Sequence, residues 1–249
     1  MADLFDLVNY TKNLLEADKF RDYCPNGLQV EGRREVRRLL TAVSANLDVL
    51  DRAVQLDADC LLVHHGYFWK QEPLPVVGIR RNRLARLLTA DLSLVAFHLP
   101  LDAHRALGNN AQLGVRLGIA VEGWFGDQAI GAHGVFAHPR SAATFAADLE
   151  RVLARPPLLI GRPETVLRRV AWCTGAAHGL LGEAIELGVD AFVTGELSEP
   201  AVHVAREAGI TLIGAGHHAT ERYGVQALGE HLASRFALHH CFLDSDNPV

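Results

Sequence analysis

The chain has 249 residues and 49% of them are hydrophobic, so it can bury a large core in one or two domains without disulfides or structural metal ions. The 24 Lys and Arg residues are outnumbered by 29 Asp and Glu residues, and the net charge of -5 argues against a dedicated nucleic-acid-binding protein. The four cysteines lie far apart with no C-x-x-C pair, which fits a reducing compartment.

The N-terminal residues lack the basic and apolar regions of a signal peptide. No run of about 18 apolar residues predicts a membrane span, so we expect a cytoplasmic protein without a membrane partner. The arginines at positions 80, 81, 83 and 86 are interpreted as a solvated helix face.

In chain order, Leu4, Leu7 and Val8 begin an apolar helical face, and Asp3 suits its N-cap. Residues 22–27 are rich in turn formers and predict a loop. From there apolar runs alternate with amphipathic stretches, which indicates a largely parallel, helix-covered sheet, or two of them. The expected strands are Leu39–Ser44, Cys60–Val63, Ser93–Phe97, Gly134–Ala137, Val170–Cys173, Ala191–Thr194, Thr211–Gly214 and Leu238–Leu243. The expected helices are Leu47–Leu56, Arg80–Ala90, Asn110–Leu117, Ala142–Leu153, Leu180–Leu187, Ala201–Glu207 and Thr220–Phe236.

A Gly-rich stretch with Trp124 and Phe125 marks the expected domain junction. It divides the chain into residues 1–125 and 126–249, with the C-terminal helix free to pack back on the first domain. The two parts resemble each other locally, since residues 59–65 and 190–196 are similar apolar strands followed by polar side chains. An ancient duplication and the general likeness of strand–helix–strand units both explain this similarity.

Histidine is frequent, with 13 in the chain, and His64 and His65 directly follow an apolar strand. Ligand sites of open α/β sheets collect at the carboxyl ends of strands. Adjacent side chains of an extended backbone point to opposite sides, so this pair suits two metal ions, or one metal ion plus a supporting role, better than bidentate binding of one ion. A strand-end pair bonded to the backbone is the alternative.

Two further strand ends carry metal-ligand residue types. His217 and Glu221 are spaced to share one helix face, and Asp102 follows the expected strand that ends at Phe97. Imidazoles mixed with carboxylates suit zinc, iron, manganese or cobalt rather than calcium or magnesium. The same histidines can also serve as core donors or general bases.

Five stretches together resemble the signatures of one known family. They are residues 23–32 (YCPNGLQVEG), 63–70 (VHHGYFWK), 98–110 (HLPLDAH with GNN), 194–196 (TGE) and 216–224 (GHHATERYG). The family is that of the dinuclear-metal, Nif-three-like proteins known as type 2 GTP cyclohydrolase I homologues, and the chain is most similar to its short, bacterial YbgI-type branch. The resemblance spans nearly the whole chain.

The resemblance implies that five residues bind two divalent metal ions per subunit, of an identity that the sequence leaves open. These residues are His64, His65, Asp102, His217 and Glu221. It also implies two related three-layer α/β domains with the site in the cleft between them, and a homohexameric toroid built as a trimer of dimers.

The resemblance favours a metal-dependent hydrolase of the GTP cyclohydrolase type, acting on a nucleotide or a related small molecule. A water bridging two metal ions has a pKa near neutrality and gives a nucleophile at ordinary pH. A non-catalytic metal-binding or interaction protein is the alternative from another class.

Several neighbouring residues carry open alternatives. His98 is a candidate for proton transfer or substrate contact, or else a buried strand-end histidine bonded to backbone. Glu196 is a candidate to support the metal ligands or to contact the substrate, or else an N-cap of the following helix. His218 is interpreted as exposed or stacked, and residues 175–179 as a weak match to a phosphate-binding turn. The histidines at positions 133, 138, 239 and 240 are interpreted as structural.

Overall fold

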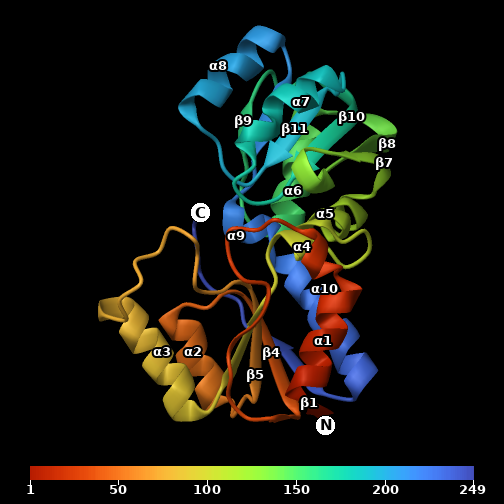
Figure 1. Cartoon of the computed structure of the whole chain (residues 1–249). Helices are drawn as coiled ribbons and strands as arrows, with labels where there is room; N and C mark the ends of the chain where they lie inside the picture. Colours follow the sequence, from red (N-terminus) through yellow and green to blue (C-terminus); the bar gives the residue numbers. More distant parts are fainter. The chain divides into compact units, whose positions relative to one another are not determined.

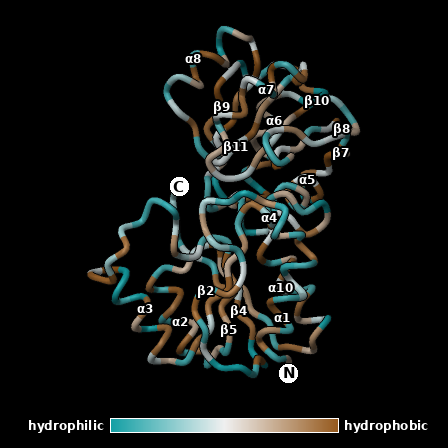
Figure 2. Tube along the Cα trace, viewed as in Figure 1, coloured by the Kyte–Doolittle hydropathy of each residue, from teal (hydrophilic) through white to brown (hydrophobic).

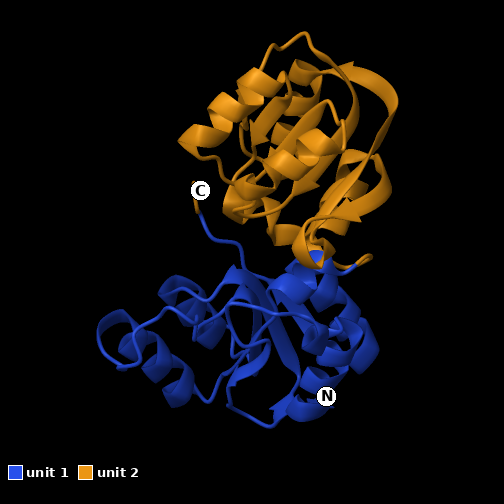
Figure 3. Cartoon of the chain, turned by 45° about the horizontal axis from the view of Figure 1, so that its top comes forward, with its two compact units in different colours: residues 1–104, 224–246 blue, residues 105–223, 247–249 orange.

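The computed structural model describes residues 1–249, which form two compact units (Figure 3). Unit 1 contains residues 1–104 and 224–246, and unit 2 contains residues 105–223 and 247–249. The predicted junction after residue 125 therefore falls inside unit 2. The strand that ends at Phe125 is hydrogen-bonded to the next strand of the same sheet, which keeps both in one unit.

The sheet of unit 1 has five strands in the order β13-β4-β5-β6-β2. They are β13 (His239–Phe242), β4 (Arg38–Ser44), β5 (Cys60–His65), β6 (Ser93–Ala96) and β2 (Gly27–Val30). The first four are parallel and only β2 is antiparallel to its neighbour. A separate antiparallel pair joins β1 (Ala2–Asp3) to β3 (Glu35–Val36). The expected parallel sheet is confirmed in this unit.

Helices cover both faces of this sheet. The helices are α1 (Leu4–Leu14), α2 (Leu47–Gln55), α3 (Gly78–Ala90), α4 (Leu99–Ala103) and α10 (Arg222–Phe236), with a 3₁₀ turn at Ala17–Lys19. Figure 1 shows α2 and α3 on one side of β4 and β5, with α1 and α10 on the other. The predicted cap is confirmed, because the Asp3 carboxylate accepts hydrogen bonds from the N–H groups of Phe5 and Asp6.

The sheet of unit 2 has six strands in the order β7-β8-β10-β11-β12-β9. They are β7 (Ile119–Phe125), β8 (Gly131–Ser141), β10 (Val166–Cys173), β11 (Ala191–Thr194), β12 (Thr211–Gly214) and β9 (Leu158–Ile160). Only β10, β11 and β12 run parallel, so the expectation of a largely parallel sheet is wrong for this unit. The short connection between β7 and β8 forces an antiparallel pair.

The core of unit 2 lies on both faces of its sheet. The helices are α5 (Asn109–Leu117), α6 (Ala142–Leu153), α7 (Leu181–Glu186), α8 (Glu199–Ala208) and α9 (His217–Thr220), with 3₁₀ turns at Asp127–Ala129 and His178–Leu180. Trp172 belongs to the cluster that contains side chains of α5 and α6, whereas its neighbour Ala171 belongs to that of α7 and α8. Strand residues thus alternate between two helix layers. The apolar strand segments appear as brown tubes in Figure 2.

The two units share a run of elements. Unit 1 passes through β4, α2, β5, α3 and β6, and unit 2 passes through β10, α7, β11, α8 and β12, with the three strands parallel in each. The mixed α/β, three-layer fold class is confirmed. No helix of the chain is both long enough and apolar enough to span a bilayer.

Candidate metal centre

In unit 1, the ends of two neighbouring parallel strands bring candidate ligands together. β5 ends with His64 and His65, and β6 leads through His98 into α4, which carries Asp102. The Nε2 atom of His64 lies 3.5 Å from Oδ1 of Asp102, and both side chains are buried. The helix α4 was not expected from the sequence. It is five residues long and begins next to Pro100, which suits the first turn of a helix.

The ring of His64 has a defined orientation. Its Nδ1 atom lies 3.0 Å from the carbonyl oxygen of Phe97, the residue that follows β6. A carbonyl oxygen only accepts hydrogen bonds, so Nδ1 carries a proton. This bond turns Nε2 to the side of Asp102, the orientation that a metal ligand requires.

His65 lies beside His64 rather than opposite to it. The two ring centroids are 4.6 Å apart, so the expectation that the pair points to opposite sides is wrong. His65 is the last residue of β5, where the regular alternation of the strand ends. The two rings have hydrogen-bond partners on opposite sides of β5. Nδ1 of His65 lies 3.1 Å from the hydroxyl of Ser44 on β4, whereas Nδ1 of His64 is bonded to Phe97, which follows β6.

His98 is held by a carboxylate that the sequence did not single out. Its Nδ1 atom lies 2.7 Å from Oδ1 of Asp22, and the backbone N–H groups of Tyr23 and Leu99 also donate to this carboxylate. Burial raises the pKa of Asp22, but His98 and the other donors outweigh it and lower the pKa to about 2. His98 is therefore bonded to a side chain, and its alternative of a ring bonded to backbone is wrong.

Two groups of potential ligand atoms in unit 1 include His98. His64, His65 and His98 offer nitrogen atoms within 4.8 Å of one another, and this group fits a metal ion. Asp22, Cys24 and His98 are equally close, but the Asp22 carboxylate is already saturated by hydrogen bonds. Burial also raises the pKa of the Cys24 thiol to about 12, which keeps it protonated. The second group therefore does not suit a metal ion.

In unit 2, α9 begins at His217 and places it against Glu221. The Nε2 atom of His217 lies 3.2 Å from Oε2 of Glu221, so the predicted i, i+4 pair is confirmed. Glu221 is buried, at 3% exposure, at the break between α9 and α10. The structure thus forms the predicted carboxylate–imidazole pair, with His217 at the start of α9 and Glu221 directly after its end.

Glu196 follows β11 and contacts His217 from the other side of the ring. Its Oε1 atom lies 2.6 Å from Nδ1 of His217. The N-cap of α8 is Ser198, so the N-cap alternative for Glu196 is wrong. A carboxylate that accepts from one ring nitrogen while the other faces the metal is a common support for ligand histidines.

The charge of His217 reflects both carboxylates. Burial lowers its pKa, but the hydrogen bonds and charges of Glu221 and Glu196 outweigh burial and raise the pKa to about 9. The two carboxylates that stabilise the positive charge of His217 would stabilise a bound metal cation in the same way.

Gly175 gives Glu221 its space. A Cβ atom at Gly175 would lie 2.2 Å from Oε1 of Glu221, and its φ of +69° also favours glycine. Its carbonyl oxygen accepts from Gly195 N–H and Glu196 N–H, which ties this turn to the segment that holds Glu196. The turn at residues 175–179 supports the carboxylate pair rather than a phosphate, since a 3₁₀ turn and only six helical residues follow it.

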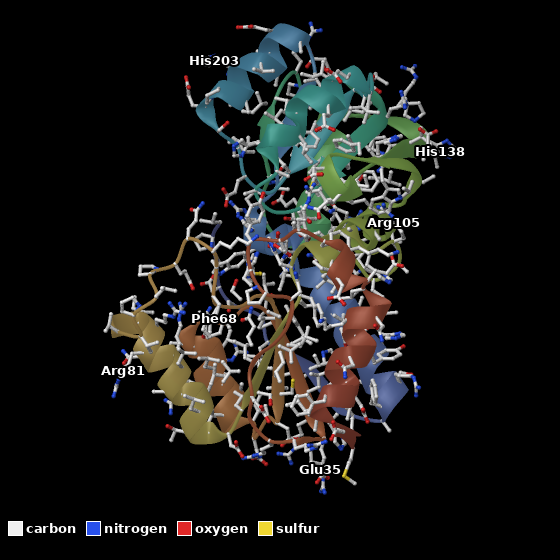
Figure 4. All side chains as sticks on the ribbon, viewed as in Figure 1. Glu35, Phe68, Arg81, Arg105, His138 and His203 are labelled. Carbon is white, nitrogen blue, oxygen red and sulfur yellow. The ribbon has the colours of Figure 1, made fainter.

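The remaining histidines mostly behave as expected. His218 is the exception, because it is buried at 6% exposure rather than exposed. His138 lies at the surface (Figure 4), and Nε2 of His240 lies 2.9 Å from the hydroxyl of Thr41. Cys60 and Cys173 are buried and form no disulfide.

The signature stretch at residues 22–30 has a clear structural role in unit 1. The Asn26 side chain accepts from the His98 N–H, and the Gln29 side chain accepts from the Tyr67 N–H. The segment therefore joins the loops that follow β5 and β6, the two strands whose ends carry the candidate ligands.

Comparison with known families places this chain. The family model of DUF34/NIF3, the NGG1p interacting factor 3 family, matches residues 2–248. The chain belongs to the DUF34/NIF3 family. Two bacterial relatives, from Pseudomonas aeruginosa and Allochromatium vinosum, are both named GTP cyclohydrolase 1 type 2 homolog. They are 53% and 50% identical to it over 99% and 100% of this chain and 98% of each relative.

Solved structures of the DUF34/NIF3 fold agree. The protein ybgI, described as of unknown function, superimposes with a TM-score of 0.95 at 44% identity over 100% of both chains. A protein from Thermus thermophilus superimposes with a TM-score of 0.91 at 35% identity, again over 100% of both chains. The predicted family is confirmed, and the structure forms parts of the predicted ligand set separately within each unit.

Proposed function

We propose that this protein binds two divalent metal ions and hydrolyses a nucleotide or a related small molecule. The proposed ligands are His64, His65 and Asp102 of unit 1 with His217 and Glu221 of unit 2. The imidazoles and carboxylates suit zinc, iron, manganese or cobalt.

The observation that carries this proposal is the orientation of two imidazole rings. In His64 and in His217, Nδ1 is bonded to an acceptor, and Nε2 faces a buried carboxylate. A buried carboxylate beside a ligand-type imidazole is costly without a compensating positive charge and natural around a cation. Gly175 adds to this, because its missing side chain leaves room for Glu221.

The chain's own residues supply orientation and proton transfer. A pair of such ions held by these ligands would acidify water and polarise the bond under attack. Glu196 and the Phe97 carbonyl orient the ligand rings, and Asp22 orients His98. Because Asp22 holds Nδ1 of His98, the Nε2 atom is the proposed group that accepts a proton during the reaction and returns it to the leaving group.

The name of the relatives, GTP cyclohydrolase 1 type 2 homolog, motivates GTP as the first nucleotide to test. The test is elemental analysis of protein purified without added metal, combined with a nucleotide hydrolysis screen. We expect two transition-metal ions per chain and turnover that chelation abolishes. A metal-replete protein that leaves GTP and a panel of nucleotides unchanged would instead support the non-catalytic metal-binding or interaction protein.

We further propose a homohexameric ring, a trimer of dimers, working in the bacterial cytoplasm. A closed ring satisfies every subunit interface, and cysteines without disulfides suit a reducing compartment. Light scattering should give about six times the chain mass of 27.1 kDa. A monomer at micromolar concentration would contradict the ring.

A further inference from the structure

Two aromatic side chains lie against His98 in unit 1 and have no part in the metal chemistry. The Trp69 ring centroid is 5.0 Å from that of His98 and 6.0 Å from that of His65. The Tyr23 ring centroid is 6.5 Å from that of His98. Tyr23 is 63% exposed and Trp69 is partly exposed, so both rings keep surface open to solvent beside the candidate ligands.

The loop after β5 holds Trp69 in place. The indole Nε1 donates to the carbonyl of Gly66 at 3.2 Å, and the backbone N–H of Trp69 donates to the Glu72 carboxylate. Phe68, labelled in Figure 4, has a φ of 64°, an uncommon conformation for a bulky residue. Its N–H donates to the same Glu72 carboxylate, and the Arg80 guanidinium lies over its ring. Strained backbone that its surroundings support is typical of binding sites.

Tyr23 belongs to the same bonded frame. Its carbonyl accepts from the Lys70 N–H at 2.8 Å, and its own N–H donates to Asp22, the carboxylate that holds His98. The backbone positions of Tyr23 and Trp69 are thus fixed relative to His98. Lys70, which follows Trp69 in the chain, is exposed.

We propose that Trp69 and Tyr23 form the binding surface for a flat nitrogen heteroaromatic ring, such as a nucleobase, beside His65 and His98. This inference rests on the proposed function and specifies its substrate class. Every nucleobase has a π face, and stacking on an aromatic side chain changes base affinity by about 5- to 150-fold. A base stacked here brings its ring atoms next to His98, the candidate for proton transfer.

The test compares two probes on the full-length protein by isothermal titration calorimetry. GMP and ribose 5-phosphate share the sugar phosphate and differ only in the base, so their Kd ratio measures base recognition. We expect GMP to bind more tightly, and Trp69→Ala to weaken GMP by about 5- to 150-fold with ribose 5-phosphate unchanged. Trp69→Phe keeps an aromatic face and should retain most of the affinity. Tyr23→Ala should weaken GMP in the same direction.

The matched control is Phe5→Ala, which removes an exposed aromatic ring in α1 that stacks with Arg34 rather than a histidine. Equal Kd values for the two probes on the wild type overturn the inference. So does an unchanged Kd for GMP in both Trp69→Ala and Tyr23→Ala, which reduces both rings to packing around His98. Base-dependent binding without hydrolysis retains the site and rejects the hydrolase, whereas hydrolysis without base-dependent binding does the reverse.

Discussion

The two units orient a histidine in different ways. In unit 1, His64 donates to the neutral carbonyl of Phe97, which fixes the ring and its tautomer without adding charge. In unit 2, His217 donates to the carboxylate of Glu196, which also makes the ring more basic and contributes to its pKa of about 9. The two candidate ligand histidines are thus held by different groups, one neutral and one charged. Variants of these groups should show how much of metal affinity comes from the orientation of the ring and how much from the added negative charge.

The largest expected effect comes from removing the buried carboxylates, one in each unit. Asp102→Ala and Glu221→Ala should each abolish at least one metal position per chain, because neutral imidazoles cannot replace the lost charge. Elemental analysis of the purified variants measures this. Glu207→Ala, an exposed carboxylate on α8, is the control and should change nothing. Two metal ions per chain in both variants would contradict the ligand assignment.

The next largest effect concerns His98, the proposed proton-transfer residue, which lies in unit 1. His98→Ala should keep its metal ions and lose about 10²–10⁴-fold in turnover, because a positioned proton-transfer group contributes about that much. Asp22→Asn should act in the same direction by disturbing the His98 ring. The surface variant His138→Ala is the control. Unchanged turnover in His98→Ala removes it from the mechanism, and a loss of metal makes it a ligand.

A smaller effect sharpens the contrast between charged and neutral support. Glu196→Gln should weaken metal binding by about 10–100-fold, the usual effect of losing the carboxylate behind a ligand histidine. Ser44→Ala removes the neutral hydroxyl behind His65 and should weaken binding less. Competition with a metal chelator measures both. Equal losses in the two variants would show that charge adds nothing to orientation.

The smallest effect tests the room beside Glu221. Gly175→Ala introduces a side chain that meets the carboxylate and a backbone conformation that costs about 1–3 kcal/mol. Its melting temperature should fall by several degrees. Gly182→Ala lies in α7 with open space around it and should not lower the melting temperature. Equal melting temperatures for Gly175→Ala and the wild type would show that the turn adapts.

The sequence predicts the parallel strands of each sheet, including the edge strand β13, and misses the antiparallel strands at the other edges. The strands β5 and β11 are short apolar runs ending in polar side chains, and both are found where expected. The antiparallel strands β2, β7 and β9 are only partly buried, so their sequences lack the apolar run that marks a central strand. These segments are strands because they are hydrogen-bonded to a neighbouring strand, and their local composition does not reveal this.

The same limit applies to the candidate site. The spacing of His217 and Glu221 predicts their contact, because four residues are one turn of a helix. Asp22 lies 76 residues before His98 in the chain, and no local pattern reveals that the two are bonded. Likewise, the side-by-side rings of His64 and His65 depend on acceptors from β4 and the end of β6.

Unit 1 is interrupted in the chain by unit 2, which sets an order of synthesis. All six strands of the second sheet lie between residues 119 and 214 and leave the ribosome before residues 224–246. Until then, the first sheet lacks β13 beside β4, and α1 lacks the buried apolar face of α10. The unit that begins the chain is therefore the last to be completed, and during translation its β4 edge is exposed to other chains and to chaperones.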